Sequence, residues 1–359
     1  MATRKAKKRA APARAASGKG PKRVNVALQG GGSHGAFVWG VLDKFLEDGR
    51  LEIEGLSGTS AGSMNAVVYA YGKLMGGPDG ARQALHDFWK RLSDSGGLFG
   101  AMQKPPWNAY WKMFSNDRTL PLKMFKMLTG SMSPYQWNPQ NVNPLRESLL
   151  ASVDFDVLNT CVDTKLFLCA TNVRTGKARV FNTHEVTAEV VIASACLPNI
   201  FQAPVIDGDA YWDGGYMGNP VLYPLFYHTV SSDVIILHVN PIERPGIPKT
   251  PPEIDNRVNE IAFNSSLMKE LRAVAFVQKL LAEGWIKDEY KAKLKNVLIH
   301  SVRSDKAVSH LGAATKFTVD WDFLTDLRDR GRDTAAQWLD ENYEFVGKRS
   351  SVDLYHEFL

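Results

Sequence analysis

Apolar residues occur along the chain either in short continuous runs or at helical spacing, and the two patterns alternate. A continuous run at 24–29 predicts a buried strand, and a second strand is expected at 51–56. The first run is followed by apolar residues at helical spacing: Phe37, Val38, Val41, Leu42 and Phe45. Gly49 is placed to end this helix. The second run is followed by another helical face: Met64, Val67, Val68, Tyr71, Leu74 and Met75. With a further helix at 80–95, this order predicts a three-layer α/β/α sandwich with a mostly parallel central sheet.

The second half of the chain continues with strands and ends in helices. Gly176 is expected to turn a hairpin between strands at 166–171 and 178–181, and a second hairpin is expected between 202–206 and 210–212. The other predicted elements are a short helix at 186–196, a central strand at 234–239, a last strand at 297–302 and a helical remainder through Trp321 and Trp338. After a proline-rich connection at 241–252 we expect an amphipathic helix at 257–282, with a buried face of Val258, Ile261, Leu271, Val274 and Leu281.

The section at 96–143 follows neither pattern. It is rich in Pro, Trp, Met and Lys, and residues 105–114 mix aromatic rings with lysine. Such rings suit a lid that dips into a lipid interface. They also suit a cap that packs on the core in the ordinary way, and the sequence leaves both interpretations open.

Length and composition are those of a globular protein. With 359 residues, 44% of them apolar and 23% charged, the chain can form one large domain or two small ones. We expect a tail at 1–23, a main domain at 24–240 and an extension at 241–359 packed on the same domain. No apolar run is long enough to predict a transmembrane helix, and the N-terminus lacks the apolar region of a secretory signal.

The net charge of +5 comes from the N-terminus. Nine of the 43 Lys and Arg residues lie at 1–23, where no acid occurs, so the remainder has 34 basic and 38 acidic residues and a charge of −4. This tail is expected to be disordered, and we favour a solvated leader over a segment that binds nucleic acid or anionic lipid. Three cysteines, Cys161, Cys169 and Cys196, without C-x-x-C spacing, favour buried thiols in a reducing cytoplasm over disulfides or a metal site.

A candidate nucleophile follows the second predicted strand. Gly58-Thr59-Ser60-Ala61-Gly62 has the G-x-S-x-G pattern, in which a serine sits on a sharp turn between a strand and a helix and projects its hydroxyl above the sheet. Small neighbours leave room for so tight a turn. The alternative is a glycine-rich loop in which Ser60 or Ser63 caps the helix.

A glycine loop follows the first predicted strand. If Ser60 attacks an ester, the oxyanion can be stabilised by backbone N–H groups of this loop, which comprises Gly30, Gly31, Gly32, Ser33, His34 and Gly35. The same spacing also matches a dinucleotide-binding fingerprint, with Glu52 or Glu54 as the ribose-binding acid. A dinucleotide enzyme gives no reason for a serine turn after the second strand, so we rank that alternative lower.

An activated serine needs a base, and no histidine stands in a motif that marks it as one; the candidates without a motif are His86, His184, His228, His238, His300, His310 and His356. Asp213, in Asp213-Gly214-Gly215, is expected on a tight, exposed turn. A carboxylate with an ordinary pKa of about 3.9 is a weak base, so this role requires a partly desolvated setting. The same three residues are also simply a good turn sequence.

In order and spacing, Gly30-Gly31-Gly32-x-x-Gly35, Gly58-Thr-Ser60-Ala-Gly62 and Asp213-Gly214-Gly215 resemble the three motifs of the patatin-like phospholipase family. The resemblance covers residues 24–240. It implies a patatin-like fold and a lipid acyl hydrolase with a Ser-Asp dyad, in which Ser60 is the nucleophile, Asp213 the general base and the glycine loop the oxyanion hole. It implies no metal or organic cofactor. Many family members have Arg or Lys where this chain has His34, so a fixed charge is replaced by a titrating one.

Our first hypothesis is therefore an esterase that cleaves acyl lipids through an acyl-enzyme on Ser60. We expect it in the cytoplasm or peripheral on a membrane or lipid surface, with an acyl lipid rather than nucleic acid as its partner. Acyl transfer to an alcohol other than water is a variant of the same chemistry. The alternative is a catalytically idle protein that binds a lipid or a protein partner, but a binder has no use for the combination of Ser60, Asp213 and the loop glycines.

Overall fold

The computed structural model describes residues 20–96, 132–244, 246–291, 294–308 and 311–358. In these residues eight strands form one sheet, in which β4 pairs with β3 outside the order β5-β6-β3-β2-β1-β7-β8. The strands are β1 (Lys22–Leu28), β2 (Leu51–Gly58), β3 (Lys165–Asn172), β4 (Ala178–Asn182), β5 (Val205–Ile206), β6 (Asp209–Asp213), β7 (Asp233–His238) and β8 (Leu298–Arg303). Neighbours from β3 through β2, β1 and β7 to β8 run parallel, whereas β4, β5 and β6 pair antiparallel at one side.

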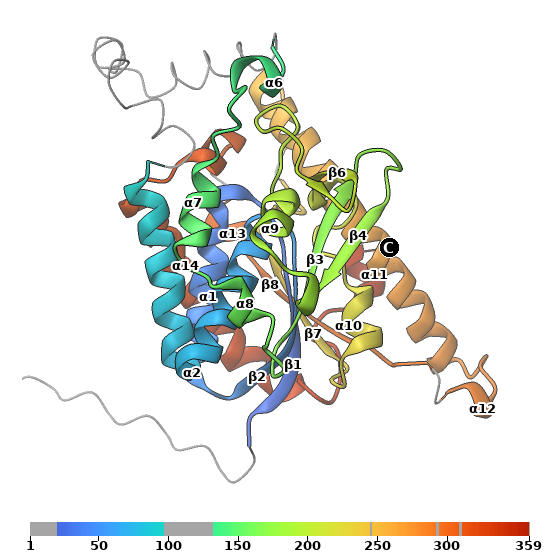
Figure 1. Cartoon of the computed structure of the whole chain (residues 1–359). Coiled ribbons are helices and arrows are strands. Elements are labelled where there is room, and N and C mark those ends of the chain that lie inside the picture. Colours follow the sequence, from blue (N-terminus) through green and yellow to red (C-terminus); the bar gives the residue numbers. More distant parts are fainter. Residues whose placement is uncertain (1–19, 97–131, 245, 292–293, 309–310, 359) are drawn as a thin grey trace, which may run out of the picture.

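Helices cover both faces of this sheet (Figure 1). One face packs on α1 (Gly35–Asp48), α2 (Ala61–Asp94) and α14 (Trp321–Asn342), and the other on α10 (Tyr223–His228) and α11 (Pro251–Ala282). Alternate residues of β1 supply the two cores, because Val26 and Leu28 lie in one apolar cluster and Ala27 in the other. The predicted three-layer sandwich with a mostly parallel centre is confirmed.

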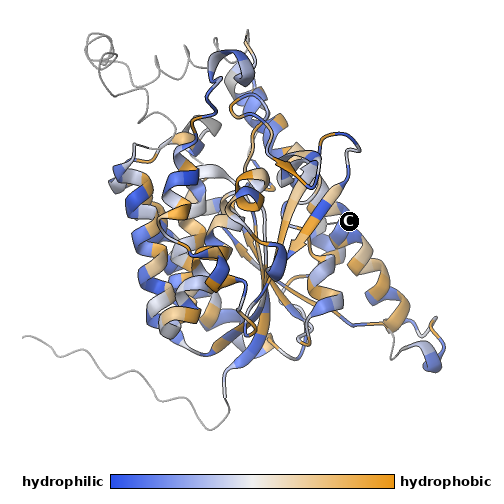
Figure 2. Ribbon diagram, in the orientation of Figure 1, coloured by the Kyte–Doolittle hydropathy of each residue, from blue (hydrophilic) through white to orange (hydrophobic). Residues whose placement is uncertain are grey.

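Hydropathy follows these layers (Figure 2). All six residues of β7 are buried, as expected for a strand covered on both faces. The remaining described helices are short: α6 (Pro134–Trp137), α7 (Pro144–Leu150), α8 (Phe155–Leu158), α9 (Ala188–Ser194), α12 (Asp288–Lys291), α13 (Asp305–Val308) and α15 (Leu354–Phe358). The 3₁₀ turns are η1 (Gly32–His34), η3 (Thr183–Glu185), η4 (Gly214–Tyr216), η5 (Ala313–Phe317) and η6 (Tyr343–Phe345).

The two helices predicted after Ser60, one with a face up to Met75 and one at 80–95, are present and are joined by a kink. The structure continues α2 from Ala61 to Asp94, with non-helical backbone angles only at Gly76 and Gly77. Leu74 and Met75, predicted on the same face as the buried residues Met64, Val67 and Val68, are 38% and 61% exposed.

The prediction for α11 is wrong in its start and in its first buried turns. The helix begins at Pro251, where Thr250 forms a capping box and proline is tolerated in the first turn. Val258 and Ile261 are 61% and 55% exposed. Glu260 and Asn264 are buried instead, because this half of the helix packs against a polar site rather than against the apolar core. Leu271 and Val274 are buried as predicted.

Several other expectations fall at or beyond the limits of the described residues. The tail at 1–19, most of the irregular section, at 97–131, and His310 lie outside them. Lys22 already belongs to β1, and its Nζ donates to the carbonyl oxygens of Tyr343 and Val346 at 2.8 and 3.0 Å. The three cysteines are buried free thiols, as predicted. Among the described helices, none combines the length and the apolar character needed to cross a membrane.

Helices α1 and α14 pack closely at Gly40. A Cβ at Gly40 would run into the carbonyl oxygen of Arg328, so Gly40→Ala must push the helices apart. We expect this substitution to lower the free energy of unfolding by about 1–3 kcal/mol, the usual range for overpacking, as measured by urea denaturation. Gly76→Ala is the matched control, because a Cβ there meets no atom within 4 Å. Equal midpoints for the two variants would contradict the close packing.

Candidate active site

Two of the three motifs leave the sheet side by side. Strands β1 and β2 are parallel neighbours with Leu28 opposite Gly58, so the glycine loop and the serine turn start from the same edge. The strand order also reverses at β1, since β2 and β3 lie on one side of it and β7 and β8 on the other. The carboxyl ends of strands at such a reversal form the usual ligand-binding crevice of an open α/β sheet.

Ser60 lies on a strained turn. Its backbone has φ 56° and ψ −124°, a conformation that costs a non-glycine residue roughly 1–3 kcal/mol. The backbone N–H of Ser60 donates to Ser194 Oγ at 3.0 Å. A Cβ on Gly62 would clash with the carbonyl oxygen of Leu28, so only glycine lets the turn lie this close to β1. The Ser60 side chain does not cap α2, which removes that alternative for Ser60.

Asp213 ends β6 and faces Ser60. Its carboxylate accepts a hydrogen bond from the backbone N–H of Gly215 at 2.7 Å, and the Ser60 side chain lies near enough to lower its pKa. The residue is 1% exposed, not on the exposed turn that its sequence suggested. Burial raises the pKa of Asp213 to about 6, although the Gly215 hydrogen bond, the Ser60 side chain and the charge of Lys316 lower it.

The glycine loop divides into anchored and open amides. The N–H of Gly30 donates to Asn219 Oδ1 at 2.7 Å, and that of His34 to the carbonyl of Gly31 at 3.3 Å. The N–H of Gly35 is also used, within the turn. Among the described residues the N–H groups of Gly31, Gly32 and Ser33 have no hydrogen-bond partner. From the sequence, the amides of all six loop residues were equal candidates for binding an oxyanion. In the structure, the three without a partner lie beside Ser60.

Buried amide side chains hold this loop, and sequence reasoning missed them. Gln29 Oε1 accepts from the backbone N–H groups of Val239 and Asn240 at 2.7 and 2.8 Å, and its Nε2 donates to Asn264 Oδ1 at 2.7 Å. Asn240 in turn donates to the carbonyl of Gly30 at 2.8 Å. The only signal in the sequence is an amide residue at or just after the end of each of two apolar strands, at 29 and 240.

Ser60 and Asp213 line a cavity of about 1040 Å³, including its open mouth, together with the loop amides. Its walls are mostly apolar and come from both halves of the chain: Ala61, Met64, Trp89, Leu92, Leu145, Ala195, Leu197, Ile200, Phe201, Phe263, Phe317 and Val319. Lys316 and Asn259 are the polar residues that the sequence did not anticipate there. The site can therefore take an apolar ligand against a small polar end.

The family model for patatin-like phospholipases matches residues 26–225, more than half of the chain. The chain belongs to the patatin-like phospholipase family. Membership supports lipid acyl hydrolase activity in general terms, and the matched range contains all three motifs.

Solved structures similar to this patatin-like chain include VipD from Legionella pneumophila and the type III effector protein ExoU from Pseudomonas aeruginosa. VipD is 16% identical with a TM-score of 0.37, and the match covers 89% of this chain and 67% of VipD. ExoU is 14% identical with a TM-score of 0.34, and the match covers 90% of this chain and 54% of ExoU, so the chain spans about half the length of that protein. A search of curated proteins found no match.

His34 is buried and does not line the cavity. Its Nε2 lies 2.7 Å from Thr315 Oγ1, and no histidine of the described residues lines the cavity. Glu54, a candidate ribose-binding acid, accepts instead from the backbone N–H groups of Val230 and Ser231 at 2.7 and 2.9 Å. The described residues also contain no cluster of His, Cys, Asp and Glu that could hold a metal ion.

The buried carboxylate predicts a pH-dependent penalty on stability. The pKa of Asp213 is about 6 in the folded protein against about 3.9 for an ordinary aspartate, so the folded state binds more protons between these values and stability falls as pH rises through them. Asp213→Asn removes this penalty. We expect the variant to be more stable than the wild type by up to about 3 kcal/mol above pH 6, with the gain shrinking towards pH 4, in urea denaturation at several pH values.

The control for this measurement is Asp209→Asn on the same strand, whose carboxylate pairs with Arg174 at the surface. Its pKa is lowered by the Arg174 hydrogen bond, so its loss brings no gain at neutral pH. A gain in stability that does not change with pH for Asp213→Asn would show that Asp213 is not desolvated.

Proposed function

We propose that this protein hydrolyses acyl esters of lipids, with Ser60 as the nucleophile and Asp213 as the general base. The observation that carries the proposal is that Ser60 and the buried carboxylate of Asp213 line one cavity, where burial raises the pKa of that carboxylate to about 6. A base of this pKa is ionised at neutral pH and accepts a proton more readily than an ordinary aspartate. The strained turn of Ser60 and the apolar cavity support the same chemistry.

In the acylation step, the Asp213 carboxylate takes the proton of the Ser60 hydroxyl as Oγ bonds to the ester carbonyl carbon. The π electrons of the carbonyl move onto its oxygen, and the N–H groups of Gly31, Gly32 and Ser33 donate to that oxyanion. When the carbonyl re-forms, the bond to the leaving alcohol breaks. Protonated Asp213 returns its proton to the alkoxide, which departs as the alcohol.

Deacylation repeats these steps with water. Asp213 takes a proton from water as the water oxygen attacks the acyl-enzyme carbonyl carbon. The same amides donate to the second oxyanion. Collapse breaks the bond to Ser60 Oγ, which recovers its proton from Asp213, and the fatty acid leaves. The proposed pathway uses only groups of this chain and water, and no metal or cofactor takes part in it.

The apolar walls suit the acyl chain of the substrate. Side chains such as Leu197, Phe201 and Phe317 surround the polar end of the cavity, so burial of alkyl groups would supply the binding energy. We further propose that residues 24–240 and 241–359 form one functional domain, since Phe263 and Phe317 line the same cavity as Ser60. We also propose that the protein meets its lipid substrate at a membrane or lipid interface.

The first test of this function is covalent labelling. A fluorophosphonate ester probe should modify Ser60, as located by mass spectrometry, and Ser60→Ala should abolish both labelling and ester hydrolysis while the fold is kept. Asp213→Asn should lower kcat by at least about a hundredfold, the range of a general base. Ser63→Ala is the matched control, because Ser63 donates only to the Ser60 carbonyl at 2.6 Å. Wild-type protein that is folded but neither labelled nor active would favour the idle, partner-binding alternative.

The second test is the pH dependence of kcat/KM. Asp213 must be ionised to accept a proton, so activity on a soluble short-chain ester should rise with pH and reach half of its maximum near pH 6, the folded pKa of Asp213. A midpoint near pH 4, the ordinary range of an aspartate, would contradict the assignment of a desolvated base.

A further inference from the structure

Lys316 is the one basic side chain among the described residues that line the cavity. It belongs to η5, far outside the residues matched by the family model. Because the remaining walls are largely apolar, a charge at this place is screened less than it would be in bulk water.

Two amide oxygens fix the ammonium group of Lys316. Its Nζ donates to Asn240 Oδ1 at 2.8 Å and to Asn259 Oδ1 at 3.2 Å. The other end of the Asn240 amide donates to the carbonyl of Gly30 at 2.8 Å. A continuous series of hydrogen bonds thus connects the ammonium with the backbone of the glycine loop.

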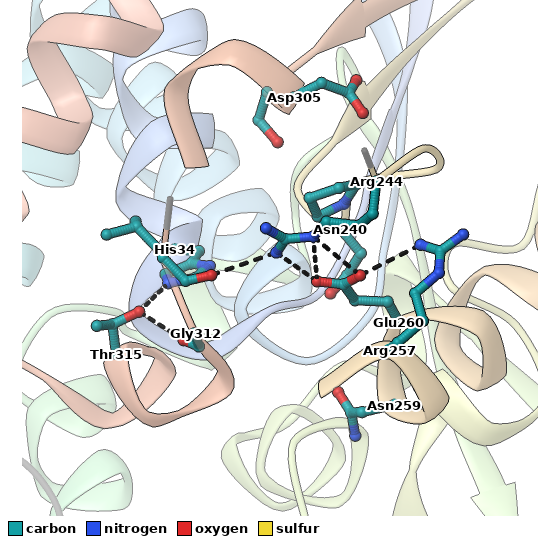
Figure 3. A network of polar contacts seen from close by, with 12 residues as sticks. His34, Asn240, Arg244, Arg257, Asn259, Glu260, Asp305, Gly312 and Thr315 are labelled. Atoms are coloured by element: carbon teal, nitrogen blue, oxygen red, sulfur yellow. Dashed lines mark hydrogen bonds and ion pairs between the residues drawn. The ribbon is translucent and has the colours of Figure 1, made fainter. Parts of the chain in front are cut away.

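The backbone around Lys316 fits the same loop. Gly32 has a positive φ of 59°, and a Cβ there would run into the carbonyl oxygen of Lys316. His34 contacts Thr315, the residue before Lys316, and Thr315 Oγ1 donates to the carbonyl of Gly312 at 2.7 Å (Figure 3). His34 therefore anchors the segment that carries the lysine.

Charged groups behind Lys316 keep the site positive. Glu260 lies between Arg244 and Arg257, with closest N–O distances of 2.6 and 3.2 Å (Figure 3). With Lys316 and Asp213, this gives three cations against two anions. The residue Lys316 is only half-buried, but its ammonium is not exposed: desolvation lowers its pKa to about 8, against the raising effects of Glu260 and Asp213, and Arg244 lowers it further.

We propose that Lys316 is a positioning residue that supplies the oxyanion site with its positive charge. It acts through Asn240 on the glycine loop and through its electric field on the oxyanion formed at Ser60. This inference rests on the proposed function, because it assigns a role in the same reaction.

The experiment compares three variants on a neutral short-chain ester. Lys316→Met removes the charge and the N–H donors, Lys316→Gln removes the charge but keeps a donor, and Lys316→Arg keeps the charge. We expect Met and Gln to lower kcat by at least about tenfold with KM little changed, and Arg to keep most of the activity; loss of a direct oxyanion donor costs roughly 10²–10³. Lys279→Met, an exposed lysine of α11, is the control for loss of a lysine as such.

The pH profile separates charge from shape. Lys316 loses its proton as pH rises through about 8, so wild-type kcat should fall there, whereas Lys316→Arg should stay active to higher pH. The charged groups that act on the side chain at position 316 are Glu260, Asp213 and Arg244. The titratable ring of His34 contacts Thr315, the residue before Lys316. Thermal melts of every variant show that each is folded before its rate is used.

Three outcomes are distinguishable. An inactive, unlabelled wild type contradicts the proposed function itself. An active wild type with equally active Lys316→Gln contradicts only the role of Lys316. Equal loss in the Met, Gln and Arg variants, with all of them folded, also contradicts it, because side-chain shape rather than charge would then control the rate.

Discussion

The site depends on keeping one carboxylate, Asp213, buried against Ser60. Water would stabilise the ionised form far better than the cavity does, and the raised pKa is the direct result of that loss. The surrounding structure compensates only in part, with the Gly215 amide, the Ser60 hydroxyl and the charge of Lys316. Such partial compensation leaves the carboxylate basic, as the proposed general base must be, and it makes the candidate active site a local source of instability in an otherwise well-packed fold.

In the rest of the polar network around the glycine loop, the buried amide side chains have hydrogen-bond partners. Gln29, Asn219, Asn240 and Asn264 are all buried, and each has hydrogen-bond partners in the loop, in the strand ends or in α11. Because buried amides without partners would destabilise the fold, this network specifies one arrangement of the loop. Among the described residues, the N–H groups of Gly31, Gly32 and Ser33 differ from this network because they have no hydrogen-bond partner.

The second half of the chain is part of this arrangement rather than an addition to it. Helix α14 packs so closely on α1 that Gly40 has no room for a Cβ, and α11 turns Glu260 and Asn264 towards the site. The family match ends at residue 225, yet Asn240, Asn259 and Lys316 lie beyond it and surround the glycine loop. The cavity is therefore completed by segments that the family motifs do not include.

The sequence by itself determined the parts of this protein that depend on local chain geometry. The apolar runs, Gly49 as a helix end and Gly58-Thr-Ser60-Ala-Gly62 after a strand were enough to predict the alternating layers and the serine turn, because period and turn chemistry act over a few residues. Only the tertiary structure decided that Asp213 is buried, that Val258 and Ile261 face outward, and that Lys316 and Asn240 lie at the glycine loop. These features depend on contacts between residues up to about three hundred positions apart, and the burial and electrostatic field they create are properties of the packed fold, which no local pattern encodes.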